Sequence, residues 1–148
     1  MRRAQDGHPI YEMELKDILK EDEGYREKPY QDSLGYWTVG YGHRTDKGLI
    51  YLNREEADRQ LDKDLQKARD EADTICGDCN INLFYHRALT LMCFQLGYYG
   101  TLGFHKMLKA MREGNSREAA QEAGKSKWAK QTPKRAARVQ RIILGADH

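Results

Sequence analysis

Two carboxylic acids and a hydroxyl group lie within sixteen residues of one another near the start of this chain. Glu23 ends a helical pattern, Asp32 lies in the turn that follows, and Thr38 belongs to a glycine-punctuated strand pattern. A proton donor and a second carboxylate are the groups that general acid–base catalysis uses. We therefore interpret residues 23–43, which read EGYREKPYQDSLGYWTVGYGH, as a candidate active site.

A single glutamate in such an acid-rich stretch would ordinarily be a solvated surface residue. The joint spacing of Glu23, Asp32 and Thr38, followed by a Gly-x-Gly-His run that ends at His43, argues against that reading. His43 itself is better explained as a histidine that another side chain satisfies than as a catalyst.

Helical periodicity predicts the element that carries the first acid. Leu15, Ile18 and Leu19 have helical spacing, which indicates a helix from about Tyr11 to Glu23. Gly24 is then a typical helix end.

A hairpin is predicted after this helix. Residues 29–34 are rich in turn formers, and residues 35–42 alternate ring and small side chains as a strand does. Gly40 and Gly42 would allow a backbone or a ligand to approach closely. The remaining elements before the next helix are a turn at 45–48 and a short strand over 49–52.

A long connecting helix is predicted over residues 53–75. Asn53, with Glu56 three residues on, forms a capping-box-like start. We expect this helix to join an α+β active-site lobe, residues 11–52, to an all-helical lobe, residues 80–148. Its apolar stripe consists of Ala57, Leu61, Leu65, Ala68 and Ala72.

The helical lobe is predicted to centre on residues 83–96, which are apolar on nearly all sides and therefore buried. Short helices follow: one is closed by Gly114, the next is capped by Ser116 and ends near Gly124, and the last starts at Thr132-Pro133. Their buried faces contain Phe104, Met107, Leu108 and Met111 in the first, and Ala136, Val139, Ile142 and Ile143 in the last.

The charge of the chain is unevenly distributed. The 148 residues suit one compact domain or two small lobes, and the formal net charge is only +2. Residues 101–148 carry eleven Lys/Arg and four Asp/Glu, whereas residues 54–73 carry five and eight. A basic C-terminal third suggests an anionic partner such as nucleic acid, a lipid surface or an acidic wall polymer, although solvated helix faces often have this composition too.

The sequence contains no apolar run long enough for a transmembrane helix and no signal peptide, so we expect the protein to accumulate in the cytoplasm. Three cysteines argue against a disulfide framework. Cys76 and Cys79 have C-x-x-C spacing without the context of a redox or zinc site, so we interpret them as ordinary thiols. Cys93 is assigned to the core. We expect no metal and no other cofactor.

Residues 23–43 resemble the active-site signature of the T-even bacteriophage lysozyme family, glycoside hydrolase family twenty-four. That signature is Glu-Gly, then Tyr-x-Asp with the Asp nine residues after the Glu, then Gly-Tyr-x-Thr-[Ile/Val]-Gly-x-Gly-His, and each element is present. The helical half is similar as well. It contains Met-x-Phe-Gln-x-Gly at 92–97, Gly-Phe at 103–104 and Ser-x-Trp-x-x-Gln-Thr-Pro-x-Arg-Ala-x-Arg-Val at 126–139. The resemblance covers essentially residues 13–144.

The resemblance implies a two-lobed α+β lysozyme fold and a role for each candidate. Glu23 becomes the general acid, Asp32 the carboxylate that stabilises charge on the sugar or activates the water, and Thr38 a residue that holds this water. In family terms the outcome is inversion at the anomeric carbon. Two influences on Glu23 oppose each other. The end of a helix disfavours its ionised form, whereas Arg135, which matches the family arginine that pairs with the catalytic glutamate, favours it.

The resemblance also assigns supporting residues. His43 and Asp64 match a family pair that would be structural rather than catalytic. Phe94 and Gln95 match positions that line the sugar cleft, although a phenylalanine on an apolar helix is often simply core. Two features depart from the family. The segment between His43 and the connecting helix is shorter than in the prototype, and Leu34 replaces an acid that usually follows the catalytic aspartate.

The implied function is that of a phage endolysin, a muramidase that hydrolyses the beta-1,4 bond between N-acetylmuramic acid and N-acetylglucosamine in peptidoglycan. Its partners would be the glycan strands and a separate holin-type protein that releases it from the host cytoplasm to the periplasm and cell wall. We expect a monomer that does not bind nucleic acid. The basic third would help the enzyme to stay on an anionic sacculus.

Three rival functions stand beside this one. A virion-associated tail lysozyme keeps the reaction, and a lytic transglycosylase keeps the fold but forms an anhydro sugar without needing a second carboxylate such as Asp32. A rival from another class is a non-catalytic cationic module that binds DNA or lipopolysaccharide. Only the enzymes depend on Glu23, so Glu23→Gln separates the two classes.

Overall fold

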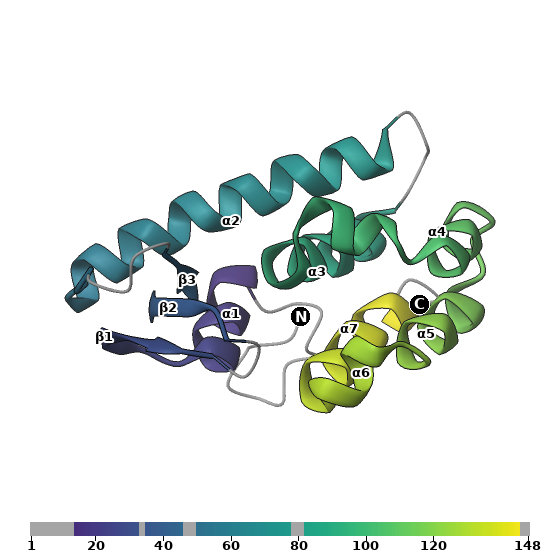
Figure 1. Cartoon of the computed structure of the whole chain (residues 1–148). Coiled ribbons are helices and arrows are strands. Elements are labelled where there is room, and N and C mark those ends of the chain that lie inside the picture. The colour runs from purple at the N-terminus through teal and green to yellow at the C-terminus, as the bar shows by residue number, and fades with distance from the viewer. Residues whose placement is uncertain (1–13, 33–34, 46–49, 78–81, 146–148) are drawn as a thin grey trace, which may run out of the picture. The chain divides into compact units, whose positions relative to one another are not determined.

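The computed structural model describes residues 14–32, 35–45, 50–77 and 82–145. These residues form two compact units, which meet within the longest helix between Lys67 and Ala68 (Figure 1). The first unit contains a small antiparallel sheet, and the described part of the second is helical. The predicted α+β class is therefore confirmed.

The first unit combines a short helix, a sheet in the order β1-β2-β3 and the first part of a long helix. Every strand pair in this sheet is antiparallel. In chain order the elements are α1 (Leu15–Glu23), β1 (Arg26–Gln31), β2 (Trp37–Gly40), β3 (His43–Arg44) and α2 (Arg54–Cys76).

α1 forms because its apolar residues share one face. Leu15, Ile18 and Leu19 are buried, as their spacing predicts. The helix ends where predicted: Gly24 has a φ of 67° and donates its N–H to the Lys20 carbonyl at 2.9 Å. The expected first turn over residues 11–13 lies outside the described residues.

The register of the sheet sorts its side chains onto two faces. Thr38 on β2 is the direct partner of Tyr30 on β1 and of Arg44 on β3, while Val39 is the partner of His43. Directly opposite residues point to the same face and successive residues to opposite faces. Val39 is fully buried and His43 is hydrogen-bonded to α2. Thr38 and its two partners therefore lie on the face turned away from α2, which we call the outer face.

α2 begins with the predicted capping box. The Asn53 N–H donates to Glu56 Oε1 at 2.9 Å, and the Glu56 N–H donates to Asn53 Oδ1 at 2.8 Å. Two backbone donors that the helix itself cannot satisfy are thereby paired. The predicted apolar stripe is buried: Ala57, Leu61, Leu65, Ala68 and Ala72 are each 2% exposed or less.

The second unit is organised around two buried helices. α3 contributes Leu89 and Met92, and α7 contributes Ile142 and Ile143, all fully buried. α7 also packs against α5 and α6. The elements after α2 are α3 (Leu83–Leu102), α4 (His105–Arg112), α5 (Ser116–Gly124), α6 (Lys127–Gln131) and α7 (Pro133–Gly145).

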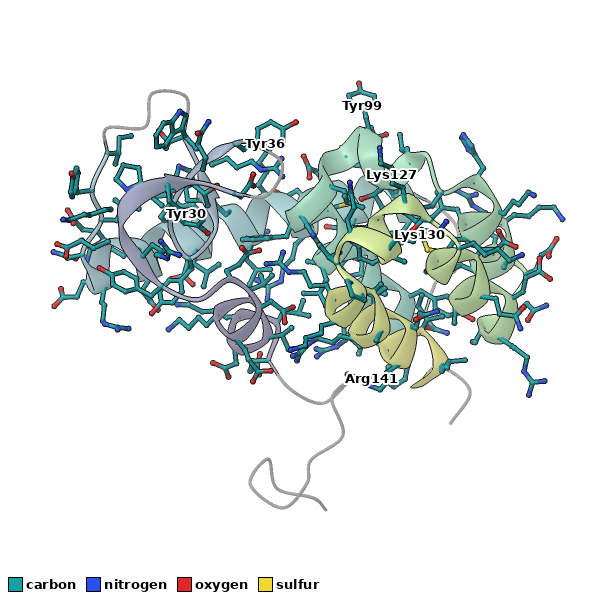
Figure 2. The ribbon with its side chains drawn as sticks, turned by 60° about the horizontal axis from the view of Figure 1, so that its bottom comes forward. Tyr30, Tyr36, Tyr99, Lys127, Lys130 and Arg141 are labelled. Carbon is teal, nitrogen blue, oxygen red and sulfur yellow. The ribbon has the colours of Figure 1, made fainter. Side chains whose placement is uncertain are left out.

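The last two helices expose a concentrated positive charge. Residues 125–145 contain seven Lys/Arg and no Asp/Glu. The side chains of Lys127 and Lys130 on α6 and of Arg141 on α7 are exposed (Figure 2). No helix among the described residues has an apolar stretch long enough to span a membrane.

The structure corrects the prediction in the first unit at two places. Residues 26–31 form strand β1, part of which was expected to be a turn, because their mostly exposed side chains show no apolar alternation. Residues 50–52, expected to be strand, are not part of the sheet. Leu52 still donates its N–H to the Glu27 carbonyl at 3.1 Å.

Three predicted details of the second unit are also wrong. α3 extends past Leu96 to Leu102, interrupted at Gly97, and Leu83 at its start is 69% exposed rather than buried. Asn115, not Ser116, caps α5, because the Ser116 hydroxyl is bonded to the Tyr85 hydroxyl. By contrast, the last helix begins at Pro133 as predicted, and the Thr132 hydroxyl before it donates to the Trp128 carbonyl in α6.

Candidate active site

The carboxyl group of Glu23 lies against the backbone of Gly42, in the turn between β2 and β3. A Cβ atom on Gly42 would stand 2.5 Å from the Glu23 carboxyl carbon. Gly42 also has a φ of 74°, a conformation that disfavours any side chain. The second glycine of the Gly-x-Gly-His run thus makes room for the candidate acid.

The backbone of Tyr36 positions the other two candidates. Its N–H donates to Asp32 Oδ1 at 2.9 Å, which closes the turn between β1 and β2. Its carbonyl accepts the Asp32 N–H at 2.9 Å and the Thr38 hydroxyl at 3.0 Å. A hydroxyl has one proton to donate, so Thr38 Oγ1 acts toward any further group as an acceptor.

β2 therefore brings the three predicted residues together. Asp32 is bonded at the Tyr36 end of the strand, Glu23 lies at the Gly42 end, and Thr38 lies between them. Thr38 is only 3% exposed, whereas Asp32 and Glu23 are partly exposed. Two acids with a buried hydroxyl between them are the elements of a hydrolytic site that places a water.

The predicted contact between His43 and Asp64 is present. Nδ1 of His43 lies 2.8 Å from Asp64 Oδ2, and Gln60 donates to the other carboxylate oxygen at 3.0 Å. The contact joins β3 to α2 on the face of the sheet opposite Thr38. Its position fits a residue that holds the sheet on the helix.

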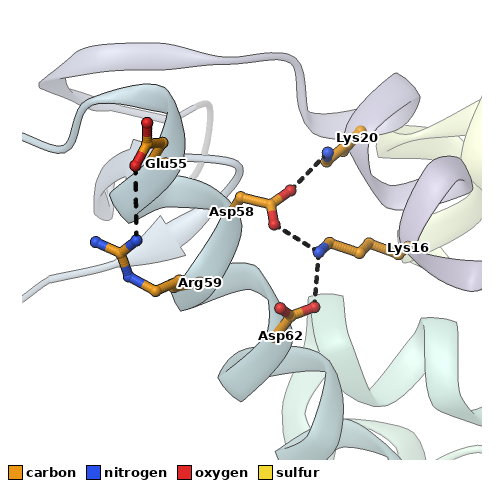
Figure 3. A network of polar contacts seen from close by, with 6 residues as sticks. All are labelled: Lys16, Lys20, Glu55, Asp58, Arg59 and Asp62. Atoms are coloured by element: carbon orange, nitrogen blue, oxygen red, sulfur yellow. Dashed lines mark hydrogen bonds and ion pairs between the residues drawn. The ribbon is translucent and has the colours of Figure 1, made fainter.

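An ion-pair network fastens α1 to α2 (Figure 3). Asp58 lies 2.7 Å from Lys16 and 2.6 Å from Lys20, and Lys16 is also 2.8 Å from Asp62. Hydrogen bonds from the two lysines lower the pKa of Asp58 to about 2, and those to the two aspartates raise the pKa of Lys16. The helix that ends in Glu23 is thereby tied to α2. The signal that we missed is the matching i, i+4 spacing of the lysines and aspartates.

Two arginine–tyrosine pairs also escaped the sequence reasoning. The guanidinium carbon of Arg44 lies 4.0 Å from the centre of the Tyr36 ring, and that of Arg26 lies 4.4 Å from the Tyr30 ring. Figure 2 labels the two tyrosines. The alternation of Tyr36 with Thr38 along the hairpin was the available signal, because residues two apart in a strand share a face.

The predicted sugar-binding residues lie on α3 in the second unit, and both are partly exposed. Gln95 Oε1 accepts the indole N–H of Trp128 at 2.9 Å. The Trp128 ring is in turn packed edge-on to Phe104, with 5.9 Å between centroids. Phe94 precedes Gln95 on the helix. Arg135 lies on α7 of the same unit, and its pairing with Glu23 stays a prediction.

A cavity of about 510 Å³ lies in the second unit among the end of α3, α4 and α5. Phe104 and Met107 give it an apolar wall, while Lys106, Lys125 and Glu122 supply charge. Its lining includes neither of the two predicted sugar-binding residues.

The thiols of the described residues are buried. Cys76 and Cys93 are thiols that form no disulfide, and burial raises the pKa of the Cys93 thiol to about 11. Cys79 and Leu34 lie outside the described residues, so the predictions that concern them stay untested. Within the described ranges, no group of His, Cys, Asp and Glu is placed to hold a metal ion.

A small antiparallel sheet near the N-terminus, a long helix and a helical unit are the elements of a lysozyme-like α+β protein. Comparison with known proteins identifies the family to which the chain belongs. A family model described as phage lysozyme matches residues 20–141, so the chain belongs to that family. This makes it a peptidoglycan hydrolase of the muramidase type.

Individual relatives agree with this placement. Probable T4-type lysozyme 1 of Dictyostelium discoideum is 30% identical over 87% of this chain and 92% of its own length. Probable T4-type lysozyme 2 of the same organism is 32% identical over 84% and 90%. The pre-baseplate central spike protein Gp5 of Enterobacteria phage T4 is 32% identical over 89% of this chain, which corresponds to 28% of that protein.

Proposed function

We propose that the protein is a phage endolysin that hydrolyses the beta-1,4 bond between N-acetylmuramic acid and N-acetylglucosamine and so lyses the host cell. The observation that carries this proposal is the placement of Glu23 and Asp32 at the two ends of β2, with Thr38 between them.

In the proposed mechanism, Glu23 gives its proton to the glycosidic oxygen while the bond from that oxygen to the anomeric carbon breaks. A water molecule attacks the anomeric carbon and passes a proton to Asp32. Thr38 Oγ1 accepts the other hydrogen of this water, since its own proton is directed to the Tyr36 carbonyl. Location of the two acids at opposite ends of a strand leaves space for a water, which supports inversion.

The resemblance to the family also assigns roles to residues of the second unit. Arg135 would pair with Glu23, and Phe94 and Gln95 would line the glycan cleft. The bond from Trp128 sets the orientation of the Gln95 amide, and this supports its assignment to an N-acetyl group of the sugar. The contact of His43 with Asp64 is assigned a structural role.

The proposed setting follows from the family. A separate holin-type protein would release the enzyme, a monomer, from the host cytoplasm to the periplasm and cell wall. The acid-free run of cations over residues 125–145 supports retention on the anionic sacculus.

A tail-associated lysozyme is a second candidate, favoured by the match to the spike protein Gp5. The two roles differ in where the protein is found. Mass spectrometry of purified virions should detect a tail lysozyme as a stoichiometric component, whereas an endolysin should be confined to the lysate.

The test of catalysis is the clearing of permeabilised cells by the wild-type protein and by Glu23→Gln. The substitution should abolish clearing while circular dichroism shows an unchanged fold. Glu21→Gln, the same change at an exposed position on the same helix, should clear as the wild type does. Clearing by Glu23→Gln would favour a non-catalytic cationic module instead.

A further inference from the structure

Beside Thr38, the outer face of the sheet carries a guanidinium stacked on an aromatic ring. Arg44 is the direct cross-strand partner of Thr38. Its guanidinium carbon lies 4.0 Å from the centre of the Tyr36 ring. Tyr36 is the residue whose backbone holds both Asp32 and Thr38. The ring of this pair therefore belongs to the turn that holds the proposed water site, and its guanidinium comes from the neighbouring strand β3.

This pair is exposed to solvent. Tyr36 is 51% exposed, and Arg44 is exposed as well, so neither side chain is there to fill a core. A guanidinium that rests on a ring by its flat side keeps its N–H donors in its plane, where they match the two oxygens of a carboxylate. The ring also limits the conformations of the long side chain, which reduces the entropy lost on binding.

We propose that Arg44, oriented by Tyr36, binds a carboxylate of the glycan substrate and makes the enzyme selective for carboxylate-bearing strands. This inference rests on the proposed function. Peptidoglycan offers a carboxylate in two places: on the lactyl group of the muramic acid where no peptide is attached, and on the stem peptide.

The chain supplies a matched control for a purely structural role. The guanidinium carbon of Arg54, at the start of α2, lies 4.4 Å from the centre of the Tyr25 ring, and Arg54 is exposed, so this is another guanidinium–tyrosine pair in the same unit. Tyr25 and Arg54 belong to the α1–β1 connection and to α2, not to the outer face of the sheet. Arg54→Leu removes the same charge and the same kind of stacking contact as Arg44→Leu.

The experiment compares initial rates on native sacculi and on sacculi whose carboxyl groups have been amidated with a carbodiimide and ammonia. On native sacculi, Arg44→Leu should raise KM about tenfold or more with little change in kcat, because one charge-assisted contact is lost. The KM of Arg44→Lys should lie between those of the wild type and Arg44→Leu, since lysine keeps the charge and loses the bidentate geometry. Arg54→Leu should match the wild type.

On amidated sacculi the KM of the wild type should rise to that of Arg44→Leu, so that the two proteins no longer differ. Strands stripped of stem peptides by an amidase locate the group. An effect of Arg44→Leu that persists on them assigns the lactyl carboxylate, and one that vanishes assigns the stem peptide. If Arg44→Leu raised KM relative to the wild type equally on native and amidated sacculi, or on neither, the inference would be overturned. Failure of the proposed function would appear separately, as undiminished hydrolysis by Glu23→Gln.

Discussion

The carboxyl group of Glu23 lies so close to Gly42 that a Cβ atom on Gly42 would stand 2.5 Å from the carboxyl carbon. Glu23 ends α1 and Gly42 lies between β2 and β3, nineteen residues later. This contact ties the end of the helix to the sheet that carries Asp32 and Thr38. The geometry of the candidate site depends on a residue that has no side chain.

Gly42→Ala should therefore lower activity more than its effect on stability explains. The positive φ of 74° should cost about 1–2 kcal/mol of folding free energy, and displacement of Glu23 should lower kcat about 100-fold. Gly114 has the same φ, and a Cβ atom there would meet nothing within 4 Å, so Gly114→Ala is the matched control. Equal kcat values for the two variants, measured on sacculi, would contradict the role given to Gly42.

Thr38→Val tests the water site. The Tyr36 carbonyl keeps its bond from the Asp32 N–H, so loss of the hydroxyl should cost less than about 1 kcal/mol of stability. Activity should fall much further, by about 100-fold in kcat, since the acceptor for the water is gone. Thr38→Ser keeps the hydroxyl and should retain most of the activity. A valine variant with wild-type kcat would remove Thr38 from the mechanism.

Asp58→Asn tests the ion-pair network through its pH dependence. The pKa of Asp58 is about 2 in the fold, below its ordinary 3.8. A lowered pKa means that the contribution to stability is present above the unfolded pKa and is lost as the pH falls through the folded one. Because 37% of the Asp58 side chain is exposed, solvent screening limits this contribution to about 1 kcal/mol.

Urea unfolding should accordingly show a deficit for Asp58→Asn of about 1 kcal/mol from pH 5 to pH 7, which shrinks between about pH 4 and pH 2. Glu55, 89% exposed and 4.0 Å from Arg59, provides a control pair whose loss should have little effect. A deficit that is undiminished at pH 2 would show that the network does not act through the charge of Asp58.

Asp64→Ala tests the structural role assigned to the contact with His43. Removal of the carboxylate leaves His43 and Gln60 without their acceptor and should cost about 1–3 kcal/mol of unfolding free energy. At a temperature well below the midpoint of unfolding, kcat should stay within about twofold of the wild type, because the contact lies on the α2 face. Lost activity with unchanged stability would instead make the contact part of the chemistry.

The features that sequence reasoning predicted well are those set by local rules. The Asn53 and Glu56 capping box and the buried stripe of α2 follow from spacing alone, and both are present. The sequence indicated that Gly42 admits a close approach, but it did not identify Glu23 as the group that approaches. The residues themselves predicted only that two acids and a hydroxyl group lie on a helix end and a hairpin.

The features that were missed depend on contacts between residues that are distant in the sequence. β1 is a mostly exposed strand with a proline at its centre, so its sequence lacks the apolar alternation of a strand. Ser116 has the composition of a helix cap, yet the Tyr85 hydroxyl engages it and Asn115 serves instead. The stacking of Arg44 on Tyr36 required the register of β2 and β3, which no local pattern in the sequence specifies.

The most direct measurement is the mass of the products when purified sacculi are digested in heavy-oxygen water by the wild type, Glu23→Gln and Asp32→Asn. The account predicts that the wild type forms reducing N-acetylmuramic acid ends that each carry one heavy oxygen, and that neither variant forms them at a comparable rate. Anhydro ends without heavy oxygen, or undiminished hydrolysis by Glu23→Gln, would contradict it.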